Sequence, residues 1–134
     1  MNYWLLLADP TTYGYEDLSS VENAVWDGIS GAPAQKNLRQ FKKGDTALIY
    51  HTAPEKAVVG TARVISDPYP DPKDETGKRV VVDVRAESRL ARRVPLANLR
   101  DNPKLSDMAF VKIQRIAVSP VSKREFDEIL RMSR

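Results

Sequence analysis

The sequence predicts an α+β fold whose sheet is strongly bent or closed into a barrel. Segments with a strand pattern outnumber segments with a helical pattern, and the two kinds do not alternate regularly along the chain. A doubly wound parallel sheet needs that alternation and is therefore not expected. The clearest strand runs from Arg79 to Leu90, where small or apolar residues alternate with charged ones. This period of two predicts one face toward the core and one toward water.

Four other segments are expected to be strands, because they are apolar or alternating runs bounded by turn residues. They are Tyr3 to Ala8, Asp45 to His51, Ala57 to Ile65 and Ile116 to Val118. The Pro-rich segment from Asp67 to Pro72 predicts a rigid loop between two of them.

Three helices are expected. A weak helical period covers Tyr15 to Ala24 and turns three side chains inward: Leu18, Val21 and Val25. A second helix is predicted from Pro33 to Phe41, since proline fits the first helical turn, and Gly44 follows its end. The last helix begins at Ser122, where the sequence S-x-x-E is typical of a capping box.

Length and composition narrow the classes of function. A length of 134 residues predicts one domain, residues 1–134. The net charge of +3 is compatible with a polyanionic partner but does not require one. The longest apolar run, Trp4 to Ala8, is too short for a membrane span, and no cationic leader precedes it. We therefore expect a cytoplasmic protein without a membrane partner. The absence of cysteine and the single histidine predict no metal site and no cofactor.

The residue set also argues against catalysis. A nucleophilic triad would need His51 beside an activated serine, and the G-x-S-x-G pattern is missing. The favoured interpretation is that His51 ends a strand and either bonds to a loop or lines a pocket. The acidic residues of the Pro-rich region are expected to be solvated, with unperturbed pKa values: Asp67, Asp71, Asp74 and Glu75. The protein is thus predicted not to be an enzyme.

A loop with an aromatic residue among small ones is the best candidate for a binding site. Trp26, Asp27, Gly28, Ile29 and Ser30 precede the helix predicted at Pro33. A tryptophan ring offers a platform for stacking, and glycine lets backbone approach a flat ligand. The alternative interpretation is that this tryptophan only plugs the end of a barrel, and both interpretations stay open.

A basic segment follows this loop. Lys36, Arg39 and Lys43 are spaced i, i+3 and i+7, which predicts one face of a helix. One interpretation is that this face contacts the phosphate backbone of a nucleic acid. The other is that it is only a solvated surface.

Residue matches in order along nearly the whole chain identify a resemblance. The sequence resembles the EVE domain, a branch of the PUA-like superfamily that also contains YTH and ASCH domains. The segments that carry it are Tyr3-Trp4-Leu5, Asp9-Pro10, Trp26-Asp27-Gly28-Ile29, Ala34-Gln35-Lys36-Asn37-Leu38-Arg39, Lys43-Gly44-Asp45, Tyr50-His51-Thr52, Val59-Gly60, Tyr69-Pro70-Asp71-Pro72, Val82-Asp83-Val84 and Arg115-Ile116-Ala117-Val118-Ser119-Pro120-Val121.

The resemblance implies a PUA-like bent β-barrel of about five or six strands with surrounding helices. It also implies a non-catalytic module that binds DNA or RNA carrying a modified base. EVE domains are associated in particular with modified cytosine in DNA. Carried over by position, the pocket would comprise Trp26, Asp27, Gly28, Ile29, Lys36, Asn37, His51, Thr52, Asp9 and Pro10. Ser30 extends this set.

The sequence departs from the family pattern at one place that bears on function. Ser30-Gly31-Ala32 stands where many members carry an arginine and an asparagine. This leaves a second hypothesis open, that the barrel is retained as a protein-interaction or small-ligand module. A hydrolase or nuclease that uses His51 is a third.

Overall fold

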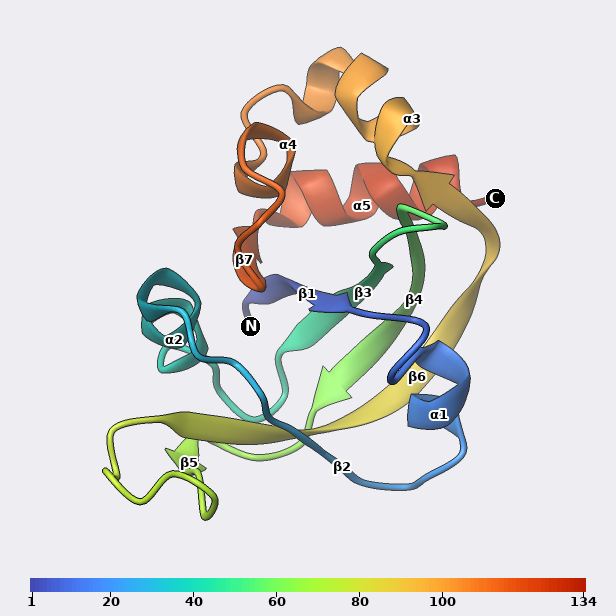
Figure 1. Cartoon of the computed structure of the whole chain (residues 1–134). Helices are drawn as coiled ribbons and strands as arrows, with labels where there is room; N and C mark the ends of the chain where they lie inside the picture. Colours follow the sequence, from blue (N-terminus) through green and yellow to red (C-terminus); the bar gives the residue numbers. More distant parts are fainter.

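The computed structural model describes all 134 residues and has a strongly curled mixed sheet (Figure 1). The strands are β1 (Tyr3–Ala8), β2 (Ala24–Trp26), β3 (Thr46–His51), β4 (Ala57–Val64), β5 (Tyr69–Pro70), β6 (Val80–Pro95) and β7 (Val118–Val121). Their order in the sheet is β2-β6-β4-β3-β1-β7, and β5 pairs with β6. β1 and β3 are parallel, and the other pairs are antiparallel. The predicted α+β fold with a bent sheet is confirmed.

Five α-helices surround the sheet, together with the 3₁₀ helix η1 (Pro103–Leu105). They are α1 (Tyr15–Ser19), α2 (Ala32–Leu38), α3 (Leu96–Asp101), α4 (Ala109–Lys112) and α5 (Lys123–Met132). Helices α3, α4 and α5 lie above the sheet in the view of Figure 1, whereas α1 and α2 lie at its ends. No helix is long and apolar enough to cross a membrane.

The apolar side chains form two clusters on opposite faces of the sheet. Alternate residues of β1 enter each one: Trp4 and Leu6 belong to the cluster that also contains α1 and α2 residues, and Leu5 to the cluster under α3, α4 and α5. Trp4 stacks on Phe41 with ring centroids 4.5 Å apart. Because both faces of β1 are covered, its sequence is continuously apolar rather than alternating.

Most predicted elements are present, with several differences. The helix predicted from Pro33 to Phe41 spans Ala32–Leu38, and the strand predicted from Arg79 to Leu90 continues to Pro95. The first predicted helix ends at Ser19, and Val21 and Val25 are 44% and 49% exposed, so their inward orientation was wrong. The strand predicted at residues 116–118 begins at Val118. β2, β5 and the helices between β6 and β7 were not predicted, because they are short and take their shape from packing.

The two edge strands of the sheet, β2 and β7, do not pair with each other. Helix α2 lies between them and supplies hydrogen bonds to both sides through two side chains. The amide nitrogen of Gln35 donates to the carbonyl oxygens of Ile29 (2.8 Å) and Val80 (3.1 Å), and its oxygen accepts from the Val80 N–H (2.9 Å). On the other side, Asn37 donates to the carbonyl of Val118 at the start of β7 (2.8 Å).

We predict that Gln35→Ala lowers the free energy of unfolding by about 2–4 kcal/mol, because three backbone groups would lose a buried partner. Gln35 is 4% exposed. Gln40→Ala is the matched control, since Gln40 lies just beyond the same helix and is exposed. Its effect should stay within about 0.5 kcal/mol. Urea denaturation of the three proteins measures both values, and equal losses would contradict the bridging role of Gln35.

Candidate functional site: a cleft between the sheet edges

A cleft of about 610 Å³ occupies the part of the gap between the two edges that α2 does not fill. Its walls come from the end of β1, the turn that follows β1, strand β2 with the linker after it, and Ala117 just before β7. The lining residues are Leu7, Ala8, Asp9, Thr12, Tyr13, Val21, Asn23, Ala24, Val25, Trp26, Asp27, Gly28, Ile29 and Ala117. The cleft is thus mainly apolar, with a few polar groups at its rim.

Two aromatic rings meet in this cleft. Tyr13 and Trp26 are in edge-to-face contact, with ring centroids 6.2 Å apart and an interplanar angle of 75°. Trp26 is only 8% exposed and belongs to the main apolar cluster, whereas Tyr13 is 38% exposed. Trp26 therefore contributes both to the core and to the cleft wall, and Tyr13 presents the more accessible ring.

A tight turn at Asp9 holds Tyr13 in place. The Asp9 carboxylate accepts hydrogen bonds from the backbone N–H (2.9 Å) and hydroxyl (2.7 Å) of Thr11, and its backbone carbonyl accepts from the Tyr13 N–H (2.8 Å). The bonds from the Thr11 hydroxyl and N–H lower the pKa of Asp9. An aspartate followed by threonines is a frequent turn former for this reason.

The opposite rim is formed by the linker after Trp26. Gly28 has a φ of +79°, a left-handed conformation in which a side chain would be strained. Asp27 points to the Pro-rich loop and pairs with Lys73 at 3.0 Å. The hydrogen bond to Asp27 raises the pKa of Lys73. Both partners are partly exposed, so the pair is accessible to a ligand.

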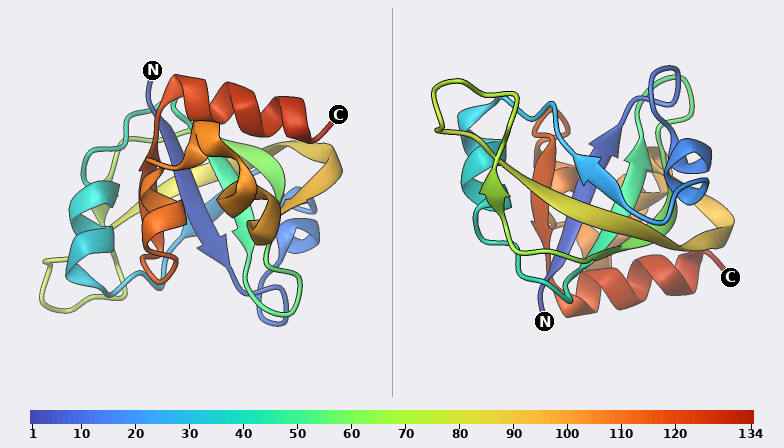
Figure 2. Two further views of the ribbon diagram at one scale, coloured as in Figure 1. Left: turned by 90° about the horizontal axis from the view of Figure 1, so that it is seen from above. Right: turned by 90° about the horizontal axis from the view of Figure 1, so that it is seen from below.

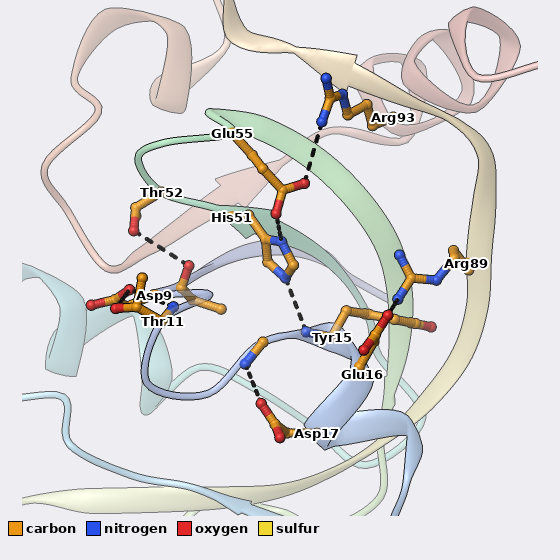
Figure 3. Close-up of polar contacts among 12 residues, drawn as sticks. Asp9, Thr11, Tyr15, Glu16, Asp17, His51, Thr52, Glu55, Arg89 and Arg93 are labelled. Carbon is orange, nitrogen blue, oxygen red and sulfur yellow. Dashed lines mark hydrogen bonds and ion pairs between the residues drawn. The ribbon is translucent and has the colours of Figure 1, made fainter.

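His51 lies behind this turn and organises the start of α1 (Figure 3). Its Nε2 accepts the N–H of Tyr15 (2.9 Å), and its Nδ1 faces the Glu55 carboxylate (2.9 Å). The imidazole proton is therefore on Nδ1, directed at Glu55, which also pairs with Arg93 at 3.6 Å. His51 thus bonds to a loop, one of the two predicted alternatives, and it is not a lining residue of the cleft.

Tyr15 fixes the position of α1 on the sheet. Its hydroxyl donates to the carbonyl of Thr61 (2.8 Å), and its ring lies directly on Gly60. A Cβ atom at Gly60 would come within 2.4 Å of the ring, so this close packing requires glycine. The turn with Tyr13 is consequently held from both ends, by β1 and by α1.

The structure separates the predicted site residues into two groups. Five of them line the cleft: Asp9, Trp26, Asp27, Gly28 and Ile29. Six do not: Pro10, Ser30, Lys36, Asn37, His51 and Thr52. The amide group of Asn37 is taken up by the β7 edge, and the Thr52 N–H and hydroxyl both bond to the carbonyl of Ala8.

The basic segment does not form the predicted helical face. Helix α2 ends at Leu38, so Arg39 caps it and Lys43 lies in the turn before β3. Arg39 donates to the carbonyl of Lys78 (2.8 Å), which ties α2 to the Pro-rich region. Only Lys36 projects from the helix itself, and Lys36, Arg39 and Lys43 are all exposed.

The acidic residues of the Pro-rich region shape their own loop. Asp74 accepts hydrogen bonds from the hydroxyl of Thr76 (2.7 Å) and the N–H of Arg79 (2.8 Å), and these bonds lower its pKa. The expectation of an unperturbed pKa was wrong for Asp74.

Sequence reasoning missed several cleft residues, of which Tyr13 is the most informative. The sequence does carry a signal for it. Tyr13 lies in the turn from Asp9 to Gly14 and has no apolar residue at strand or helix spacing with which it could pack in a core. Val21 and Val25 were also missed as cleft residues. They are exposed because they line the cleft instead of packing in the core.

The family pattern of the EVE domain matches residues 2–132. The chain belongs to the EVE domain family. This EVE domain is similar to thymocyte nuclear protein 1 of Mus musculus, with 28% identity over an alignment of 163 positions that covers 96% of this chain and 72% of the mouse protein.

Solved structures of relatives have the same fold as this EVE domain. A protein of Rhodopseudomonas palustris is 32% identical with a TM-score of 0.94, and the match covers 99% of this chain and 93% of that chain. Human THYN1, solved in complex with DNA containing 5-methylcytosine, is 25% identical with a TM-score of 0.90, covering 99% of this chain and 98% of that chain. An ASCH protein of Zymomonas mobilis shares the fold at a TM-score of 0.63.

We predict that His51→Ala increases the hydrogen-exchange rate of the Tyr15 amide by about tenfold or more, because that N–H loses its only acceptor. Glu55→Gln is the control. An amide oxygen can still accept the Nδ1 proton of His51, so Nε2 stays available to Tyr15 and the amide should remain protected. Exchange measured by NMR distinguishes the two variants. Equal exchange in His51→Ala and the unaltered protein would show that α1 is held without His51.

Proposed function

We propose that this EVE domain is a non-catalytic nucleic-acid-binding module that holds one modified base, with modified cytosine in DNA as the preferred ligand. The observation that carries the proposal is the aromatic cleft between the sheet edges, where Tyr13 and Trp26 are in edge-to-face contact. The complex of human THYN1 with DNA containing 5-methylcytosine supports the choice of ligand.

The chemistry of the cleft suits a single flat base. Aromatic side chains stack on any base, because every base has a π face. Carboxylates accept hydrogen bonds from the exocyclic amino group of cytosine, and Asp27 and Asp9 are the carboxylates of this cleft. The apolar walls at Val21 and Val25 favour an added methyl group, by about 0.8 kcal/mol if it is fully buried.

The surroundings of His51 support a role without catalysis. A general base needs a free ring nitrogen within reach of its substrate. In this protein the Nε2 of His51 is taken up by the Tyr15 N–H and its Nδ1 by Glu55, while the side chain is buried. His51 is therefore better suited to position the turn that carries Tyr13 than to remove a proton from a ligand.

The test of this proposal is binding of short oligonucleotides by the Tyr13→Ala variant. Stacking contributes roughly 1–3 kcal/mol per base, so affinity for an oligonucleotide with one 5-methylcytosine should fall about ten- to a hundredfold. Tyr13 is a better target than Trp26, because removing the buried Trp26 ring would also cost about 3–5 kcal/mol of stability. Fluorescence anisotropy measures the affinity.

Tyr13→Phe is the control, since it keeps the ring, and should bind within about threefold of the unaltered protein. The oligonucleotide recovered after binding should be intact. Unchanged binding by Tyr13→Ala would show that Tyr13 does not contact the base. Absence of oligonucleotide binding by the unaltered protein would favour the protein-interaction or small-ligand hypothesis, and cleavage would favour the hydrolase.

The exposed cations of the α2 side should contact phosphates without reading the base. We predict that Lys36→Gln and Lys43→Gln each flatten the dependence of log affinity on log salt by about one unit, equally for modified and unmodified DNA. Arg124→Gln is the control, because Arg124 is also exposed but lies on α5, across the sheet. A changed preference for the modified base with an unchanged slope would refute the backbone role.

A further inference from the structure

One exposed apolar side chain remains unexplained by the cleft. The large apolar residues with high exposure are Met1, Tyr13, Val21, Val25 and Ile113. Three of them line the cleft, and Met1 is the N-terminal residue. Ile113 is 45% exposed and lies in the loop between α4 and β7. Single apolar side chains are common on protein surfaces, so it is the place of Ile113 in the structure, and not its exposure alone, that points to a ligand.

The loop that carries Ile113 is firmly held. Gln114 donates to the carbonyl oxygens of Phe110 (2.9 Å) and Val111 (2.5 Å) at the end of α4, and Arg100 of α3 donates to the Gln114 side chain (2.9 Å). Further along, the carbonyl of Ala117 accepts the N–H of Leu7 (3.0 Å). Ile113 therefore projects from a preorganised loop, whose other end lines the cleft.

Cations flank this side chain. Lys112 and Arg115 are exposed, and the nearest carboxylate to Lys112 is that of Asp107 at 4.0 Å, itself almost fully exposed. Arg115 forms no ion pair. In the left view of Figure 2 this loop lies along the same side of the molecule as the end of β1 and the linker between β2 and α2. An apolar side chain between two cations thus stands on a loop whose other end, at Ala117, lines the cleft.

We infer that Ile113 is a wedge that enters a DNA duplex and fills the gap left when the modified base turns into the cleft, while Lys112 and Arg115 hold the phosphates on either side. This inference rests on the proposed function and adds that the partner is double-stranded. Extruding a base costs stacking energy, and apolar side chains inserted between base steps are a common means of replacing it. A single strand has no such gap to fill.

The experiment compares two forms of one oligonucleotide with a single 5-methylcytosine, as a duplex and as the free strand. Ile113→Ala should weaken binding of the duplex by about tenfold, and binding of the single strand by less than about twofold. Ile113→Leu keeps an apolar tip and should bind the duplex nearly as well as the unaltered protein. An adenine analogue that fluoresces when unstacked, placed next to the modified base, should brighten with the unaltered protein and much less with Ile113→Ala.

The outcomes separate the wedge from the base-binding cleft. Equal weakening of the duplex and the single strand by Ile113→Ala would overturn the wedge, since Ile113 would then contact the strand generally. Normal binding of both forms would overturn it as well. In either case the effect of Tyr13→Ala on the single strand still tests the cleft. If the unaltered protein bound neither form, the proposed function itself would be wrong.

Discussion

The incomplete closure of the sheet is the constraint on which the rest of this structure depends. The edges β2 and β7 face each other without pairing, and unpaired backbone groups at a sheet edge need partners. Two side chains of α2 bond on either side of this gap: Gln35 to Val80 of β6 and to Ile29 in the linker after β2, and Asn37 to Val118 of β7. A seven-residue helix has marginal stability by itself. These hydrogen bonds and the burial of its apolar face therefore stabilise α2, just as α2 stabilises the two sheet edges.

The remaining part of the same gap is the candidate binding site. Its shape depends on contacts at some distance from any ligand. The turn with Tyr13 is fixed at one end by Asp9 and at the other by α1, whose first N–H bonds to His51 and whose Tyr15 ring rests on Gly60. A rigid support of this kind lowers the entropic cost of binding any ligand in the cleft, because the aromatic ring is already held in place.

Positive charge lies around this opening rather than within it. The cleft itself contains carboxylates and no lysine or arginine, whereas exposed cations lie on the α2 side and on the loop before β7. Under the proposed function, this arrangement would separate two tasks of nucleic-acid recognition: the cations would contact phosphates and position the strand, and the cleft would contact the base. Cations grouped in this way would let a chain with a net charge of only +3 bind the polyanionic partner that we propose.

The sequence alone determined the strands with a strong apolar pattern, the capped helix at Ser122 and, through the order of its family segments, the PUA-like fold. Five of the predicted site residues line the cleft, because they are local neighbours on one linker or one turn. The tertiary structure decided the rest. Asn37 and His51 are polar residues whose partners, Val118 and Tyr15, are distant in sequence, so their bonding roles follow only from folding. Tyr13, Val21 and Ile113 break no local rule, and only the assembled surface shows that they are left uncovered, because burial is a property of the whole packing and not of a segment.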